Sequence, residues 1–328
     1  MNLVLTGATG FLGKSLTDYL LFEHYDIRAL VRQSSSELPL SVKQVAVGDF
    51  ADLALNDSFG FLREEFNGVD VVVHAAARVH VMSDDVSNPL AEFRKVNRDA
   101  TLVLANLAAK ADVKRFVFLS SIKVNGEMTE ADHPFKPDDV YLPNDPYGLS
   151  KYEAEQGLLA LAQETGMEVA IIRPPLIYGP GVKANFASMK KWMGKPVLLP
   201  FGAIYNQRSL VALDNLVNFI SLCADREKSP KAANQVFLIS DGEDVSTTQL
   251  LRKVRLSLKL QSRSGITAWL VPVPVSIMTF FAKLLGKEAV ANRLFGSLQV
   301  DSSKAHDLLG WAPAITMDEQ LAKITKDT

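Results

Sequence analysis

Near its N-terminus the chain reads Leu3-Val4-Leu5-Thr6-Gly7-Ala8-Thr9-Gly10-Phe11-Leu12-Gly13. A short apolar run typical of a buried strand leads directly into a glycine-rich turn, and a helical pattern follows over residues 11–22. Gly7 allows a tight turn, Gly10 lets the main chain approach a pyrophosphate, and Gly13 lets helix and strand pack closely. Because the helix N-terminus faces the turn, this stretch predicts a dinucleotide site.

The alternation of strand and helix continues through the first half of the chain. Helices are expected at 89–110 and 147–164, and strands at 27–31, 42–47, 69–74, 116–120 and 169–172. The apolar runs are continuous, which is typical of parallel strands that are buried on both faces. The sequence therefore predicts an α/β fold, a Rossmann-type doubly wound parallel sheet, with residues 1–178 as the dinucleotide-binding domain.

The second half has a different organisation. Proline and glycine cluster between Pro174 and Gly181, and the pattern then becomes irregular. Helices are expected at about 184–193, 213–224 and 247–258, with one more strand at 236–239. We therefore expect residues 179–328 to form mainly a smaller C-terminal substrate-binding region, with about 208–240 returning to the first domain.

Composition excludes several classes of protein. Among 328 residues, Lys and Arg number 35 and Asp and Glu number 37, which gives a net charge of −2. Nucleic-acid binders usually show a basic excess, so none is expected as a partner. The single cysteine, Cys223, excludes an intramolecular disulfide, and the five scattered histidines favour no metal site. With one thiol and no export-signal pattern, a cytoplasmic location is expected.

One segment, residues 266–282, carries no charge and is nearly long enough for a membrane span. Pro272 and Pro274 interrupt it, and Lys283 and Lys287 follow closely. We predict an extended Val-Pro-Val-Pro stretch that leads into a buried or cleft-covering helix at 275–285. Peripheral membrane contact is the less favoured alternative, and a true span is the least favoured.

Further motifs follow the glycine turn in a set order. They are Gly48-Asp49-Phe50, His74-Ala75-Ala76-Ala77, Ser120-Ser121-Ile122-Lys123-Val124-Asn125-Gly126, Pro146-Tyr147-Gly148-Leu149-Ser150-Lys151, Arg173-Pro174 with Tyr178-Gly179-Pro180-Gly181, and Leu309-Gly310-Trp311. With these motifs the chain resembles the extended short-chain dehydrogenase/reductase family, which contains the nucleotide-sugar epimerases and dehydratases. The resemblance spans nearly the whole chain.

The resemblance implies Ser121, Tyr147 and Lys151 as the catalytic residues. Tyr147 and Lys151, four residues apart on a helix, share one face, so the ammonium is expected to lower the pKa of the phenol. The phenolate takes a proton from a sugar hydroxyl while hydride passes to the cofactor, and the reverse reaction returns both. His74 is expected to be a satisfied core histidine. The residues expected to contact the cofactor are Gly7, Thr9, Gly10, Phe11, Leu12, Arg32, Asp49, Phe50, Ala75, Ala76, Ala77, Asn97, Tyr147, Lys151 and Pro174.

One short stretch of sequence reduces the number of reactions that the family resemblance allows. Dehydratases of the family carry Thr-Asp-Glu where this chain has Ser121-Ile122-Lys123, so the two carboxylates needed for 4,6-dehydration are missing. The remaining functions are 4-epimerisation or 4-keto reduction of a nucleotide sugar, in particular a UDP-(N-acetyl)hexose of bacterial polysaccharide synthesis. The alternatives are an NADPH-dependent reductase of a non-sugar carbonyl and a non-catalytic NADP-sensing protein.

The choice of cofactor depends on the end of the second strand. Where NAD-binding relatives have an acid, this chain has Leu30-Val31-Arg32, and an arginine fits a 2′-phosphate. NADP is therefore favoured over NAD.

On the substrate side, the resemblance suggests Lys123, Asn185 and Arg208, with Arg78 and His80 held more loosely. Two departures from the family pattern stand at Asn125 and Leu176, where many relatives have Tyr and Asn. The resemblance also implies a homodimer through the helices at 89–110 and 147–164.

Overall fold

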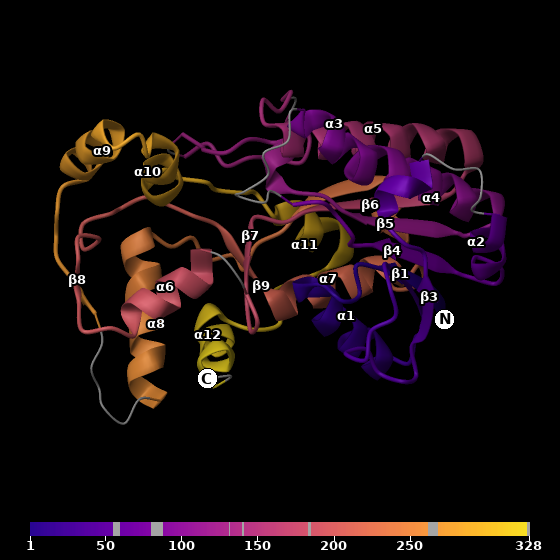
Figure 1. Cartoon of the computed structure of the whole chain (residues 1–328), viewed down its shortest axis with the longest axis horizontal. Coiled ribbons are helices and arrows are strands. Elements are labelled where there is room, and N and C mark those ends of the chain that lie inside the picture. The colour runs from indigo at the N-terminus through magenta and orange to yellow at the C-terminus, as the bar shows by residue number, and fades with distance from the viewer. Residues whose placement is uncertain are drawn as a thin grey trace.

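The computed structural model describes residues 1–54, 60–79, 88–130, 132–139, 141–182, 185–261 and 268–326. It consists of a parallel sheet between two layers of helices, with a smaller group of helices and short strands beside it (Figure 1). The glycine turn lies at the edge of the sheet that faces this smaller part, which places the expected dinucleotide site between them.

The main sheet has the order β3-β2-β1-β4-β5-β6-β10, and all its strands run parallel. The strands are β1 (Asn2–Thr6), β2 (Asp26–Val31), β3 (Lys43–Ala46), β4 (Val71–His74), β5 (Arg115–Leu119), β6 (Glu168–Arg173) and β10 (Gln235–Leu238). The chain moves outward from β1 in one direction and then returns to β4 beside it. The strand order therefore reverses between β1 and β4, where doubly wound folds bind ligands beyond the carboxyl ends of the strands.

Both faces of this sheet are buried. Leu3 and Leu5 of β1 pack into one core with α1 (Phe11–Phe22) and α7 (Leu213–Ala224). Val4 points to the opposite core, with α4 (Ala100–Lys110) and α5 (Pro146–Thr165). This two-sided burial is the reason that the strand sequences are continuously apolar. The predicted fold class is confirmed.

Short helical segments shape the loops of the sheet domain. They are η1 (Phe50–Ala54), α2 (Gly60–Glu65), α3 (Pro89–Arg94), η3 (Lys95–Asp99), η4 (Ile122–Val124) and η5 (Pro230–Ala232). The helix expected at 89–110 is continuous from α3 to α4, but η3 is a π-helical turn that the sequence did not reveal. Such turns are frequent at functional sites, and this one carries Asn97.

The smaller part has its own core. Two short parallel pairs, β7 (Leu176–Tyr178) with β9 (Leu210–Ala212) and β8 (Leu198–Leu199) with β11 (Trp269–Leu270), join helices α6 (Asn185–Met193), α8 (Thr247–Gln261) and α12 (Met317–Lys326). Tyr178, Leu251 and Leu321 belong to this core. The helix α11 (Ser303–Leu309) leads back to the sheet domain, where the Trp311 indole donates to Asn218 Oδ1 at 2.8 Å.

Helix α9 (Val275–Leu284) forms where the sequence predicted a helix, but the prediction of a buried helix is wrong, because none of its residues is buried. It packs on α10 (Glu288–Phe295) at the end of the molecule farthest from the sheet (Figure 1). Within the described parts of the chain, no helix is both long enough and apolar enough to cross a bilayer.

A buried ion pair ties the end of β6 to α5. The Arg173 guanidinium donates to both carboxylate oxygens of Glu155, and Glu155 is fully buried. The same guanidinium donates to Asn125 Oδ1 at 3.0 Å, and the Asn125 amide donates to the carbonyl of Lys136. Asn125 therefore holds the end of β6 to the loop after β5, and its side chain faces the protein interior.

The first prediction concerns this ion pair. Arg173→Met leaves the Glu155 carboxylate buried without its partner, so the free energy of unfolding in urea should fall by about 3–5 kcal/mol. The double variant Arg173→Met/Glu155→Met should recover most of that loss, because the buried charge is gone. As a control, Lys14→Met breaks the exposed pair with Glu37 and should change stability by less than about 1 kcal/mol. A loss of that small size in Arg173→Met itself would contradict the account.

Candidate active site

The glycine turn is held against the end of β4. Gly7 has a φ of 76°, and a Cβ on it would lie 2.8 Å from main-chain atoms of Ala75 and Ala76. A Cβ on Gly13 would lie 1.9 Å from the Gly7 carbonyl oxygen. Both positions therefore require glycine, one for conformation and contact and the other for the close packing of α1, as the spacing predicts.

This turn can receive an anionic group. The first-turn amides of a helix have no acceptor within that helix, and the first turn of α1 contains no acidic residue. Gly10 precedes α1 in an extended conformation without a side-chain cap, and both Thr9 and Gly10 are exposed. These features fit the pyrophosphate of a dinucleotide at the N-terminus of α1.

Ser121 and Tyr147 meet at the end of β5. Ser121 begins η4, while Tyr147 lies in the first turn of α5, which Asp145 caps by accepting from the Gly148 amide at 3.1 Å. A Cβ on Gly148 would lie 2.8 Å from the Lys123 carbonyl oxygen, so glycine lets α5 begin directly against η4. As a result, the Ser121 hydroxyl lies near enough to the Tyr147 phenol to influence its pKa.

Lys151 lies one helical turn after Tyr147 and is 1% exposed. Its ammonium donates to the Leu119 carbonyl at 2.9 Å and stands 4.4 Å from the centre of the Phe118 ring. Burial lowers its pKa to about 7, and the charge of Glu155 opposes that shift. Lys151 is therefore a buried amine with hydrogen atoms left over for a polar ligand.

The phenol of Tyr147 does not behave as the sequence predicted. Burial raises its pKa to about 12, the hydrogen bond from Ser121 opposes the rise, and the charge of Asp145 adds to it. Lys151 is not among the groups that shift it, so the expected lowering by this ammonium is wrong for the structure described. Near neutral pH the group is a phenol, which can donate a proton to an oxygen placed between it and Ser121.

A second polar group supports a ligand at this place. The hydroxyl of Ser120, directly after β5, is buried and has no hydrogen-bond partner among the described residues. Buried hydroxyls are normally paired, so an unpaired one beside Ser121 and Lys151 fits a polar group of a bound molecule. A nicotinamide dinucleotide fits these features together: the glycine turn, the Lys151 hydrogen atoms that have no acceptor, and the Ser120 hydroxyl.

His74 at the end of β4 is a core residue, as expected. Thr101 Oγ1 donates to the Asn97 carbonyl, so it accepts from His74 Nε2 at 2.9 Å, and Nδ1 then accepts from Thr6 Oγ1 at 2.7 Å. The ring stacks on Phe118, and burial lowers its pKa to about 3. This neutral, fully bonded imidazole joins β1, β4 and α4.

The buried amide of Asn97 links two parts of the site. Its Oδ1 accepts from the Arg78 amide at 2.9 Å, and its Nδ2 donates to the Arg78 carbonyl and to Ser150 Oγ, each at 3.0 Å. Ser150 in turn donates to the Tyr147 carbonyl. Asn97 thus holds the segment after β4 to the first turn of α5, and its polar atoms are engaged within the protein.

The other residues expected at the cofactor also lie at the carboxyl edge. Arg32 and Asp49 are exposed, directly after β2 and shortly after β3. The Phe50 side chain is buried in the core, and Pro174 is buried with its carbonyl accepting from the Ile122 amide. The three half-buried alanines that follow β4 are Ala75, Ala76 and Ala77.

On the substrate side, Lys123 is placed two residues after Ser121. Its ammonium lies 2.9 Å from Glu127 Oε1 and 3.2 Å from Asp145 Oδ1, between two carboxylates. Sequence reasoning missed Asp145, although an Asp followed by Pro146 is a helix-start signal that could have located it.

Arg208 is held from one side only. One of its terminal nitrogens donates to the carbonyls of Arg293 and Gly296, at 2.9 and 3.0 Å. Burial lowers its pKa. Its other guanidinium nitrogens have no partner among the described residues and can serve an anionic ligand. Leu176 is exposed on β7, whereas His80 and the Asn185 side chain lie outside what the structure describes.

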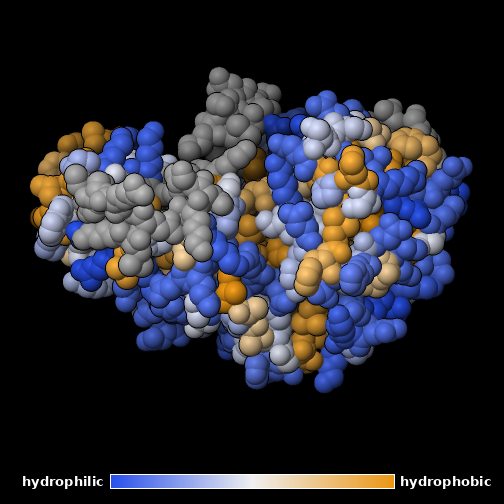
Figure 2. Space-filling model, turned by 90° about the horizontal axis from the view of Figure 1, so that it is seen from below, coloured by the Kyte–Doolittle hydropathy of each residue, from blue (hydrophilic) through white to orange (hydrophobic). Residues whose placement is uncertain are grey.

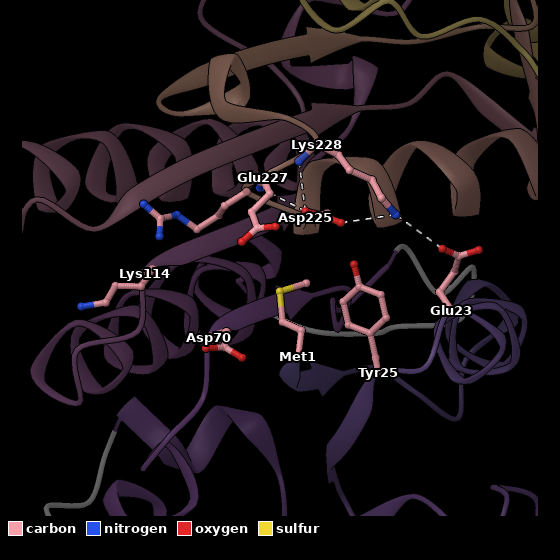
Figure 3. Close-up of a pocket in the computed structure, with 9 residues that line it drawn as sticks. Met1, Glu23, Tyr25, Asp70, Lys114, Asp225, Glu227 and Lys228 are labelled. Atoms are coloured by element: carbon pink, nitrogen blue, oxygen red, sulfur yellow. Dashed lines mark hydrogen bonds and ion pairs between the residues drawn. The ribbon is translucent and has the colours of Figure 1, made fainter.

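A different pocket lies at the opposite, amino-terminal edge of the sheet (Figure 3). Within its lining, Lys228 lies 3.7 Å from Glu23 and 3.4 Å from Asp225. None of the residues expected to be functional lines this pocket. The carboxyl edge therefore remains the candidate active site. The pocket is lined by Met1, Glu23, Tyr25, Asp70, Lys114, Asp225, Arg226, Glu227 and Lys228.

A glycine turn at the switch point of the sheet, with Ser, Tyr and Lys grouped beyond β5, defines a dinucleotide-dependent enzyme of the short-chain dehydrogenase/reductase type. Comparison with known proteins agrees with this class. The chain belongs to the NAD dependent epimerase/dehydratase family, whose pattern matches residues 3–239. It is accordingly an NAD(P)-dependent enzyme of the nucleotide-sugar epimerase and dehydratase family.

Individual relatives extend over the whole chain. A UDP-glucose 4-epimerase of Vibrio cholerae is 45% identical to this chain, and the alignment spans 97% of this chain and 92% of that protein. The N-acetyl-alpha-D-glucosaminyl-diphospho-ditrans,octacis-undecaprenol 4-epimerase of Escherichia coli O157:H7 is 28% identical, with 98% of this chain and 93% of that protein aligned. A crystal structure of UDP-glucose 4-epimerase with UDP-glucose from Thermotoga maritima superposes with a TM-score of 0.74 at 24% identity, covering 99% of this chain and 98% of that one.

The second prediction follows from His74. Its pKa is about 3 in the folded protein and about 6.5 when unfolded, so between these values only the unfolded chain binds the proton. The contribution of His74 to the free energy of unfolding is therefore fully present above pH 6.5 and is lost as the pH falls toward 3. Between about pH 6 and pH 4, the free energy of unfolding of the wild type should fall more steeply than that of His74→Gln, by about 1.4 kcal/mol per pH unit. Parallel curves for the two proteins would contradict the assignment.

Proposed function

We propose that this enzyme transfers a hydride at C4 of a nucleotide sugar, in particular a UDP-(N-acetyl)hexose, as a 4-epimerase or as a 4-keto reductase. The observation that carries the proposal is the grouping of Ser121 and Tyr147 beside the buried Lys151, where η4 and the first turn of α5 meet. Two positions support the exclusion of dehydration: Ile122 is apolar and buried, and Lys123 is a cation held between carboxylates.

The protein groups would act as follows. In the reductive direction the Tyr147 phenol donates its proton to the C4 oxygen, while Ser121 donates a hydrogen bond to the same oxygen. A bound nicotinamide supplies or accepts the hydride. In the oxidative direction the phenolate removes the proton of the C4 hydroxyl, which requires the pKa of Tyr147 to fall from about 12. A positive charge brought close to the phenol would lower it.

The substrate class is supported by Arg208. The guanidinium nitrogens of Arg208 that have no partner among the described residues suit a diphosphate through charge-assisted hydrogen bonds. The Vibrio cholerae and Escherichia coli relatives are both named as 4-epimerases of sugars carried on a diphosphate. This agreement favours a sugar diphosphate over a non-sugar carbonyl. A non-catalytic NADP sensor would have no need for the Ser121–Tyr147 pair.

The third prediction tests Tyr147. Tyr147→Phe removes the proton donor, so turnover of UDP-N-acetylglucosamine, UDP-glucose or their 4-keto derivatives should fall by about 10²–10⁴-fold. Cofactor affinity, measured by calorimetry, should stay close to that of the wild type.

Tyr25→Phe is the matched control, because Tyr25 lies at the opposite edge of the sheet. Full activity of Tyr147→Phe would refute the mechanism. A wild type that turns over only non-sugar carbonyls would replace the proposed substrate class.

The fourth prediction concerns the choice of cofactor. Arg32 is exposed directly after β2, and the strand end Leu30-Val31-Arg32 contains no acid, so we propose that Arg32 receives the 2′-phosphate of NADP. Arg32→Glu should weaken NADPH binding by about tenfold or more and should weaken NADH binding much less. Arg63→Glu, at an exposed arginine of α2, should change neither. Equal binding of both nucleotides by the wild type would overturn this assignment.

A further inference from the structure

The outer face of α9 is apolar, and its large side chains stay exposed among the described parts of the chain. Ile277, Phe280, Phe281 and Leu284 follow the spacing of one helix face, and Leu285 comes directly after them. Phe280 is 65% exposed, Phe281 55% and Leu284 72%. Hydrophobic surface gathers at this end of the molecule, at the left edge of Figure 2. A run of large apolar side chains on one exposed helix face marks an interaction surface.

Two cations border this face. Lys283 on α9 and Lys287 just after it are exposed, and neither has an ion-pair partner among the described residues. The helix contains no acidic residue, and Glu288 is the first that follows. Large apolar side chains flanked by unpaired lysines are the pattern of a helix that lies in the plane of a membrane interface.

We propose that α9, together with Leu285 and Lys287, is a docking surface for an anionic lipid bilayer. Phe280, Phe281 and Leu284 would enter the boundary between headgroups and acyl chains, while the two lysines would meet lipid phosphates. The helix has ten residues, far fewer than the roughly 20 that a span needs, so it lies on the membrane.

The charges distinguish this occupant from a second copy of the chain. In a two-fold contact centred on α9, both copies would bring Lys283 and Lys287 to the same interface, and α9 itself contains no acid to pair with them. The cores of protein interfaces are also depleted of lysine. An anionic bilayer satisfies both the apolar side chains and the cations.

The position of α9 relates the proposed docking surface to the substrate side of the active site. It packs on α10, and the carbonyl of Arg293 in α10 holds Arg208. The docked surface therefore belongs to the same end of the molecule as the residue proposed to bind the diphosphate. This arrangement suits a sugar product that is consumed by glycosyl transfer at the membrane. The docking itself does not depend on the proposed chemistry.

The test is sedimentation of the full-length protein with vesicles of phosphatidylcholine alone or mixed with phosphatidylglycerol. The wild type should sediment with the anionic vesicles, and added salt should release it because it screens the lysines. Phe280→Ser/Phe281→Ser should lower the partition coefficient at least about tenfold, because two aromatic rings no longer enter the bilayer. Lys283→Glu/Lys287→Glu should lower it by a similar factor.

Matched controls use equally exposed residues elsewhere. Phe22→Ser, on α1, and Lys110→Glu/Lys231→Glu should partition as the wild type does. All these changes are at the surface, so the variants should keep the wild-type melting temperature. The proposal fails if the wild type ignores both kinds of vesicle, or if the α9 variants bind as well as the controls. A third result would also contradict the proposal: the wild type binds no vesicles but forms a dimer, and Phe280→Ser/Phe281→Ser abolishes that dimer. A second copy of the chain would then cover this face.

Discussion

The structure depends on the close approach of the turn after β1 to the end of β4. A Cβ on Gly7 would clash with the main chain of Ala75 and Ala76, and one on Gly13 would overlap the Gly7 carbonyl. This contact sets the N-terminus of α1 at the point where the strand order reverses. The first N–H groups of α1, which have no acceptor within the helix, therefore lie at the carboxyl edge of the sheet. The polar residues at the ends of β4 and β5 lie at the same edge.

The proposed chemistry follows from the effect of burial on the pKa values of Tyr147 and Lys151 at the carboxyl edge of the sheet. The same desolvation that raises the pKa of the Tyr147 phenol lowers that of the Lys151 ammonium, and both shifts favour the uncharged forms. The site without a ligand therefore holds a phenol ready to donate a proton. A positive charge is needed beside the phenol before it can act as a base. The direction of catalysis is thus coupled to the charge state of whatever binds beside Lys151.

The sheet domain was predictable from sequence because its signals are local and agree with one another. The helices at 11–22 and 213–224 have the predicted bounds, and the strands of the main sheet differ from prediction by one or two residues at their ends. The glycine spacing also predicted the tight turn at Gly7 and the close packing of α1 at Gly13. Burial of His74 was foreseen, since its strand is continuously apolar.

Other features come from packing between distant segments. The π turn at Asn97 has no local signature, and its role emerges only when Arg78 and Ser150 are brought together. The pKa of Tyr147 depends on burial and on Asp145, whereas sequence spacing pointed only to Lys151. Helix α9 was predicted to be buried or to cover a cleft because its composition is apolar, and burial proved wrong because composition does not tell whether a partner element covers a helix. Of the described elements, α10 packs on one side of α9, and the large apolar side chains of the other face stay exposed.

The central claim is that a hydride moves at C4, and isotopic labelling tests it directly. UDP-N-acetylglucosamine carrying deuterium at C4 would be incubated with the enzyme and its cofactor in ordinary water, and the products analysed by NMR. The account predicts that deuterium stays on C4 of the inverted sugar or is found on the reduced nicotinamide ring. Loss of the label to solvent during turnover would show proton abstraction in place of hydride transfer and would contradict the account.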